Sequence, residues 1–207
     1  MIRNILFDMG NVLIRFEPET FLTLAGVTEE ADRDLLRRVV FRSVEWVKLD
    51  RGDLTDEEAL ALMFPRLPER LHPVARQMVS HWADFGLVVD GMYDLVQELH
   101  EKGYELYLLT NAALSQRRFF PTFPVGRFFE GRVFLSAEWK LLKPCTDYFE
   151  AALRHFGLKG EECVFIDDAP YNVEAALRTG TEGIIFRGSA PLLRQELRAL
   201  GVDVAEE

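Results

Sequence analysis

Short runs of apolar residues recur along the chain, and each of them ends close to a polar group. Several of the runs are almost continuously apolar, which is typical of strands that are buried on both faces of a parallel sheet. We therefore predict strands over residues 2–8, 104–110, 132–136, 163–168 and 181–187.

Helical periodicity separates most of these runs. Apolar residues follow the i, i+3, i+4, i+7 spacing over residues 92–99, and Gly103 then stands where a helix would end. The same spacing recurs over residues 149–156, directly before Gly157. Strands that alternate with helices predict an α/β fold with a doubly wound parallel sheet.

The stretch from about Phe16 to Phe85 differs from the rest because it contains no clear strand. Thr55 and Glu58 have the spacing of a capping box before an apolar run. A stripe of apolar residues at helical spacing runs over residues 71–82. We predict an all-helical insertion directly after the first strand. Its methionine and aromatic residues, Trp46 included, are expected to form the core of a helical bundle.

Polar side chains stand at the ends of the predicted strands or in an adjoining loop. In a parallel sheet the carboxyl ends of the strands meet in one crevice, which is where ligands bind. The residues expected at this crevice are Asp8, Thr110, Asn111, Lys143, Asp167 and Asp168.

The composition of this set indicates metal-assisted phosphate chemistry. Three carboxylates that are crowded together repel one another and raise each other's pKa. A bound Mg²⁺ would relieve this repulsion, since it prefers oxygen ligands and leaves room for a substrate phosphate. Lys143 and Thr110 would then contact the remaining phosphate oxygens. Asp8 would act as the carboxylate nucleophile that forms an aspartyl phosphate.

Four segments in this order, FDMGNVL, LLTN, KP and IDD, resemble the motifs of the haloacid dehalogenase-like superfamily of phosphohydrolases. The segment SVEWVKLDRGDLTDEEAL resembles the cap of its subgroup with a small helical cap, which includes sugar-phosphate phosphatases. The resemblance covers the whole family domain. It implies a Rossmann-like core of residues 1–15 and 87–207 and a mobile cap of residues 16–86. It also implies Mg²⁺-dependent phosphoryl transfer, with Asp8, Gly10, Asp167 and Asp168 at the metal.

The sequence departs from the family pattern at Gly10, where many family phosphatases carry a second Asp. That Asp protonates the leaving group and then activates water, and such help is worth ~10²–10⁴-fold. The backbone carbonyl that this position lends to Mg²⁺ is still present. Three outcomes are open: slow hydrolysis, another acid such as Glu17 or a cap residue, or a leaving group that needs less protonation. The last outcome predicts a preference for sugar 1-phosphates over 6-phosphates.

Composition narrows the range of partners. The net charge is −10, which argues against nucleic acid or an anionic membrane as the main partner. No apolar run approaches the ~20 residues of a membrane span, and the N-terminus does not resemble a signal peptide. We expect a cytoplasmic protein, monomer or homodimer, that acts on a small phosphorylated metabolite. Arg15 follows the first motif closely and could contact the substrate.

Other functions fit parts of the pattern. A metal-independent 2-haloacid dehalogenase would use the same nucleophile, but it would not need the acidic pair Asp167–Asp168. A phosphomutase would return the phosphoryl group to its sugar. A signalling receiver module carries its acidic pair early in the chain, whereas here the pair comes late. A non-catalytic binding protein of the same fold stays open because of Gly10.

Overall fold

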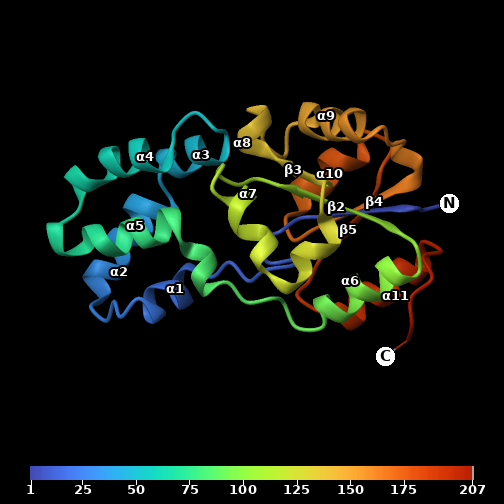
Figure 1. Cartoon of the computed structure of the whole chain (residues 1–207), viewed down its shortest axis with the longest axis horizontal. Coiled ribbons are helices and arrows are strands. Elements are labelled where there is room, and N and C mark those ends of the chain that lie inside the picture. Colours follow the sequence, from blue (N-terminus) through green and yellow to red (C-terminus); the bar gives the residue numbers. More distant parts are fainter. Residues whose placement is uncertain (207) are drawn as a thin grey trace.

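A parallel sheet of five strands lies at the centre of the protein, in the order β3-β2-β1-β4-β5 (Figure 1). The structure is a computed structural model that describes residues 1–206, apart from the side chains of residues 83 and 85. The strands are β1 (Asn4–Phe7), β2 (Glu105–Thr110), β3 (Val133–Leu135), β4 (Cys163–Asp167) and β5 (Glu182–Ile185). The predicted Rossmann-like α/β fold is confirmed. Each strand is slightly shorter than predicted, because its outermost residues already belong to loops.

Helices cover both faces of the sheet, which explains why the strands read as nearly continuous apolar runs. In β1, Ile5 and Phe7 join the core on one face, whereas Leu6 joins the core on the other. The helices on the Ile5 side are α6 (Met92–Glu101) and α11 (Ala190–Ala199), and those on the Leu6 side are α9 (Thr146–Phe156) and α10 (Pro170–Leu177).

Between residues 16 and 85 the described residues form helices and no named strand, as predicted. Figure 1 shows these helices as a lobe beside one end of the sheet. They are α1 (Pro18–Leu24), α2 (Glu30–Leu36), η1 (Arg37–Phe41), α3 (Val44–Asp50), α4 (Asp56–Met63), η2 (Phe64–Arg66), η3 (Glu69–Leu71), α5 (His72–Ser80) and η4 (Trp82–Phe85). The shorter elements after β2 are α7 (Gln116–Phe119), η5 (Phe120–Thr122), η6 (Pro124–Phe129), α8 (Ser136–Trp139) and η7 (Gly160–Glu162).

Two local features of the insertion test the sequence pattern. The predicted capping box is present at the start of α4, where the Thr55 hydroxyl accepts from the backbone N–H of Glu58 and the Glu58 carboxylate accepts from that of Thr55. The predicted stripe over residues 71–82 does not form one helix. Helix α5 ends at Ser80, and Trp82 lies in the separate turn η4.

The end of α3 is attached to the core through α8. The Ser136 hydroxyl donates to the carbonyl oxygen of Asp50 and accepts from the backbone N–H of Ala112. Gly52 has a φ of +75°, and a Cβ on it would lie 2.1 Å from the carbonyl oxygen of Ala137. Only glycine fits such a close approach of two backbones. This junction therefore holds α3 at a defined place beside the loop after β2.

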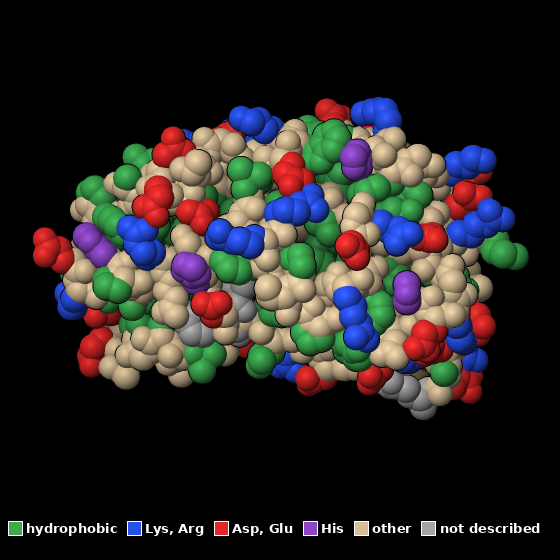
Figure 2. Space-filling view, in the orientation of Figure 1, with side chains coloured by type: hydrophobic (Ala, Val, Ile, Leu, Met, Phe, Trp, Pro, Cys, Tyr) green, Lys and Arg blue, Asp and Glu red, His purple; other side chains and the backbone are tan. Residues whose placement is uncertain are grey.

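The surface carries charges of both signs. On the face drawn in Figure 2, Lys and Arg side chains are interspersed with Asp and Glu, and many of them pair. For example, Arg33 and Arg37 both bind the carboxylate of Glu19. Among the described residues, no helix has the length and apolar character required to cross a membrane.

Candidate active site

The polar residues predicted at strand ends gather at one edge of the sheet. Asp8 directly follows β1, Thr110 ends β2 and Asp167 ends β4. Strands β1 and β4 are neighbours, and the strand order reverses between them. Such a switch point leaves a crevice at the carboxyl ends of the strands. The backbone N–H of Asp8 donates to the carbonyl oxygen of Ile166, which ties the first motif to the fourth.

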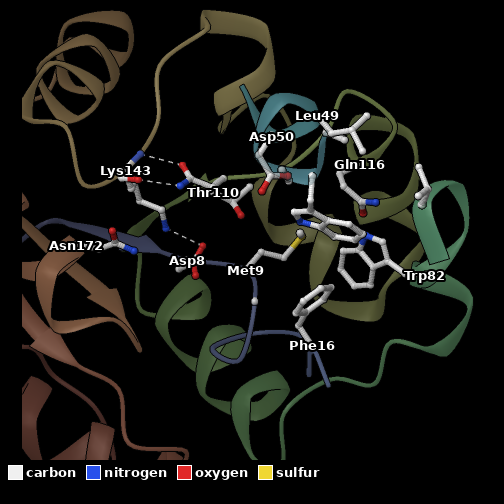
Figure 3. Close-up of a pocket in the computed structure, with 16 residues that line it drawn as sticks. Asp8, Met9, Phe16, Leu49, Asp50, Trp82, Thr110, Gln116, Lys143 and Asn172 are labelled. Atoms are coloured by element: carbon white, nitrogen blue, oxygen red, sulfur yellow. Dashed lines mark hydrogen bonds and ion pairs between the residues drawn. The ribbon is translucent and has the colours of Figure 1, made fainter. Parts of the chain in front are cut away.

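Lys143 lies at the centre of this group. Its Nζ is 2.8 Å from Oδ1 of Asp8 and 2.6 Å from Oδ2 of Asp167, and its side chain is 2% exposed (Figure 3). Burial alone would lower the pKa of Lys143, but the two carboxylates raise it overall. The side chain is therefore a buried, permanently charged ammonium that is paired with two acids.

Asn111 positions the loop that carries Lys143. Its amide nitrogen donates to the carbonyl oxygen of Lys143 at 3.0 Å, and its amide oxygen accepts from the backbone N–H of Lys143 at 2.9 Å. Both ends of the amide are thus engaged within the protein. Asn111, which was expected at the substrate, lines the cavity beside Asp8, and its hydrogen bonds also hold Lys143 in place.

Asp8, Asp167 and Asp168 each offer a carboxylate oxygen, and these atoms lie within 4.8 Å of one another. Both oxygens of Asp167 are already occupied, since the Asn172 amide donates to each at 3.0 Å and Lys143 binds one of them. Asp168 is exposed, and its carboxylate accepts a long contact of 3.4 Å from the Asn11 amide. Asp8 and Asp168 therefore have the freer oxygens for a metal ion.

The charge balance of this cluster fits a divalent cation. The pKa of Asp8 is raised to about 6, chiefly by burial, with Lys143 lowering it and Asp167 raising it. Burial also raises the pKa of Asp168, with Asp167 adding to the effect. The single positive charge of Lys143 therefore does not neutralise the three neighbouring carboxylates. A hard cation such as Mg²⁺ binds oxygen ligands of this kind and would stabilise their ionised forms.

A cavity of about 180 Å³ lies between these residues and the helical insertion (Figure 3). Asp8, Gly10, Thr110 and Lys143 line it from the core. Most of its other lining is apolar. The apolar side chains are those of Met9, Phe16, Trp46, Leu49, Val79 and Trp82.

Two residues that the sequence suggested do not reach this cavity. Arg15 forms an ion pair of 2.6 Å with Asp90 and does not line the cavity. Glu17 is exposed and accepts from the Thr20 hydroxyl at 2.8 Å. A substrate contact for Arg15 and a replacement acid at Glu17 therefore have no support in the geometry.

Several residues at the cavity were not singled out from the sequence as site residues. Asp50 and Gln116 line it, and no hydrogen-bond partner is found for either polar atom of the buried Gln116 side chain. Trp46 and Trp82 pack in the hydrophobic core as predicted, and both also line the cavity. The aromatic stripe gives no signal for this, because a tryptophan in a bundle core and one at a cavity have the same spacing.

Comparison with known proteins agrees with this geometry. The sequence profile of the haloacid dehalogenase-like hydrolases matches residues 2–180. The chain therefore belongs to the haloacid dehalogenase-like hydrolase family. Both the predicted family and the predicted hydrolase class are confirmed.

Three relatives illustrate the range of the family. Flavin mononucleotide hydrolase 1 of Arabidopsis thaliana is 28% identical over 77% of this chain, which spans 63% of that protein. A sesquiterpene phosphatase of Aspergillus oryzae is 26% identical over 94% of both chains. A family enzyme of Bacteroides thetaiotaomicron, solved with magnesium and inorganic phosphate, is 25% identical with a TM-score of 0.67, covering 91% of this chain and 96% of that one.

Proposed function

We propose that this protein is a Mg²⁺-dependent phosphatase that hydrolyses a small phosphorylated metabolite through an aspartyl phosphate on Asp8. The observation that carries the proposal is the carboxylate of Asp8 at the cavity, 2.8 Å from a buried ammonium and beside a second acid, Asp168, whose carboxylate is exposed. The two curated relatives above are a nucleotide hydrolase and a phosphatase, and a solved relative holds magnesium and phosphate. These names support the same class of reaction.

Each residue of the site has its own role in phosphoryl transfer. A carboxylate oxygen of Asp8 attacks phosphorus in line, the bond to the leaving oxygen breaks, and water then cleaves the aspartyl phosphate to restore Asp8. Lys143 offsets charge that develops on the phosphoryl oxygens, and the Thr110 hydroxyl binds one of them. Asp8, Asp168 and the Gly10 carbonyl would hold Mg²⁺, which supplies further charge neutralisation when it is bound.

The division of the chain into two parts belongs to this proposal. Residues 1–15 and 87–207 form the catalytic core, and residues 16–86 form the cap. The cap contributes Phe16, Trp46 and Asp50 to the cavity above Asp8. Its function would be to exclude water and to contact the leaving group. A cytoplasmic location and the choice between monomer and homodimer stay predictions.

The proposal is tested by phosphate release from 4-nitrophenyl phosphate. We expect activity with Mg²⁺ and a loss of at least about a hundredfold in EDTA, restored by excess Mg²⁺, because the clustered carboxylates need the cation to stay ionised around a phosphate dianion. Equal activity in EDTA would contradict the metal requirement. The absence of any turnover of phosphate esters would instead favour a non-catalytic binding protein.

Two alternatives give different products. A 2-haloacid dehalogenase would release chloride from 2-chloropropionate without metal, and a phosphomutase would convert a sugar phosphate to its isomer without free phosphate. The three carboxylates within 4.8 Å of one another favour the metal-dependent phosphatase over the dehalogenase.

The glycine at position 10 bears on which phosphate esters react fastest. Gly10 provides no acid for the leaving group, so esters with better leaving groups react faster where no other side chain replaces that acid. A phosphate on the anomeric oxygen departs more readily than one on a primary alcohol. In that case glucose 1-phosphate should have a kcat/KM about tenfold or more above that of glucose 6-phosphate, within the ~10²–10⁴-fold that proton transfer is worth. A preference for the 6-phosphate would remove the argument from Gly10.

The cavity adds a further guide to the substrate. Its volume of about 180 Å³ is below the ~300–1,000 Å³ of sites for drug-sized ligands, so a small ester fits the conformation described here. Its apolar lining favours an organic group that is small and mainly hydrophobic. The unpartnered amide of Gln116 favours one polar group on it, since a buried amide without a partner costs ~1–3 kcal/mol.

A further inference from the structure

The missing acid at Gly10 leaves a proton to be supplied, and the cavity contains a side chain that can supply it. We propose that Asp50, at the end of cap helix α3, is the general acid that protonates the leaving group and the general base that then activates water. This inference rests on the proposed phosphatase function. It assigns the acid–base role to the cap instead of to the loop after β1.

Asp50 lies in the same cavity as Asp8, although the two residues belong to different parts of the fold. Figure 3 shows Asp50 projecting from the cap helix toward the space between Thr110 and Met9, while Asp8 projects from the end of β1. Of the described residues that line the cavity, Asp8 and Asp50 are the two carboxylic acids. Glu17, the other acid suggested by the sequence, does not line it.

The geometry of in-line attack brings the leaving group to the side of Asp50. When Asp8 attacks phosphorus from the sheet, the leaving oxygen lies on the opposite side of phosphorus and therefore faces the cap. Lys143 is bound to Asp8 and Asp167 on the sheet side, so it is not placed to donate there. Asp50 is the ionisable group of the cap that the cavity exposes to this position.

The backbone around Asp50 is held firmly. Its carbonyl oxygen accepts from the Ser136 hydroxyl, which also accepts from the N–H of Ala112, two residues after Thr110. The close approach of Gly52 to Ala137 fixes the turn that follows α3. The acid is therefore attached to the loop that carries the phosphate-binding threonine.

The protonation of Asp50 suits an acid that works near neutral pH. The pKa of Asp50 is raised to about 7, chiefly by burial and then by the negative charge of Asp8, while a hydrogen bond from the Trp46 side chain lowers it. A group with a pKa near the working pH both donates and accepts protons efficiently.

Asp50 loses one proton and regains another in each catalytic cycle. Asp50 starts protonated and gives its proton to the leaving oxygen as the P–O bond breaks, which releases the alcohol. The Asp50 carboxylate then accepts a proton from the water that attacks the aspartyl phosphate, so that phosphate leaves and both aspartates are restored. Ester and water are thus converted to alcohol and phosphate with no further reactant.

The dependence of the rate on the leaving group tests this role. Phenyl phosphate and 4-nitrophenyl phosphate have similar shapes, but phenolate, whose acid has a pKa of about 10 like tyrosine, needs a proton much more than nitrophenolate does. We expect Asp50→Asn to reduce kcat/KM for phenyl phosphate by ~10²–10⁴-fold and for the nitrophenyl ester by less than about tenfold. The matched control is Asp53→Asn, an exposed acid three residues away that pairs with Arg51, and it should change neither value.

A second variant separates chemistry from folding. A Cβ on Gly10 would meet only the Phe16 Cβ, at 3.8 Å, so the backbone there accepts the Cβ of Gly10→Asp without a clash. The double variant of Asp50→Asn and Gly10→Asp should have a kcat/KM for phenyl phosphate at least about tenfold above that of Asp50→Asn alone, because the second substitution returns an acid to the cavity.

Three results would overturn the inference. They are an equal loss on both esters, no loss on phenyl phosphate, and a wild-type enzyme that already discriminates strongly against phenyl phosphate. Mg²⁺-dependent activity of the wild-type protein on 4-nitrophenyl phosphate would show that the proposed function holds whichever of these occurs. A wild-type protein inactive on both esters would instead overturn the proposed function itself.

Discussion

Replacing Asp8 by asparagine is expected to reduce phosphate release from 4-nitrophenyl phosphate by at least about a thousandfold in kcat/KM. Asparagine has the same shape but is a neutral amide, and it cannot attack phosphorus to form the acyl phosphate. Residual turnover would come only from binding and charge stabilisation by the remaining residues. The measurement is a continuous assay of nitrophenolate release with saturating Mg²⁺.

The control for this experiment is Asp94→Asn, which changes an exposed acid on α6 and should leave kcat/KM unchanged. A single turnover with ³²P-labelled ester should leave label on acid-quenched wild-type protein and none on Asp8→Asn. If the Asp8→Asn protein, with a normal unfolding curve, kept more than about a tenth of wild-type activity, the nucleophile would have to be another residue.

The second large effect concerns the stability of the metal-free protein. Lys143→Met is expected to lower the free energy of unfolding by about 3 kcal/mol in EDTA, because it leaves the carboxylates of Asp8 and Asp167 buried without their common cation. Phosphatase activity should fall with it, since Lys143 also offsets charge on the phosphoryl group. Urea unfolding at neutral pH measures the loss.

The reference variant is Lys159→Met, an exposed lysine whose replacement should change the free energy of unfolding by no more than ~0.5 kcal/mol. The loss in Lys143→Met should be smaller at pH 5 than at pH 8. The pKa of Asp8 is already raised to about 6, and without the ammonium a buried carboxyl is protonated still more easily as the pH falls, which removes the uncompensated charge.

Mg²⁺ should also restore stability to this variant. A cation that binds the native state and not the unfolded chain stabilises it in proportion to the logarithm of its concentration. It should bind more tightly where the lysine no longer competes for the carboxylates. A Lys143→Met protein as stable as Lys159→Met in EDTA would mean that the ion pair seen here contributes nothing to the fold.

A proton donor in the cap links the chemistry to the position of the cap. In a protein with the acid beside the nucleophile, both groups sit on the same rigid strand end. If Asp50 is the donor, the leaving group is protonated only while α3 lies against α8, through the contacts of Ser136 and Gly52. Substrates that keep the cap open would then lose this help, which gives the cap a part in selectivity.

The positions of the strands along the chain and of the helical insertion could be predicted from the sequence because both depend on local patterns. A strand buried on both faces requires a run of apolar residues, and a capping box requires Thr55 and Glu58 at a fixed spacing. Topology then brings the carboxyl ends of β1, β2 and β4 to one edge. For this reason Asp8, Thr110 and Asp167 could be predicted to meet there.

The tertiary structure alone decided which side chains face the cavity and which support others. Asp167 and Asp168 are adjacent in sequence, yet one is enclosed by Lys143 and Asn172 and the other is open. Arg15 and Asp50 both belong to the segments around the cap, and only Asp50 lines the cavity. These differences arise from contacts between residues far apart in the chain, which a periodic pattern of polar and apolar positions does not encode.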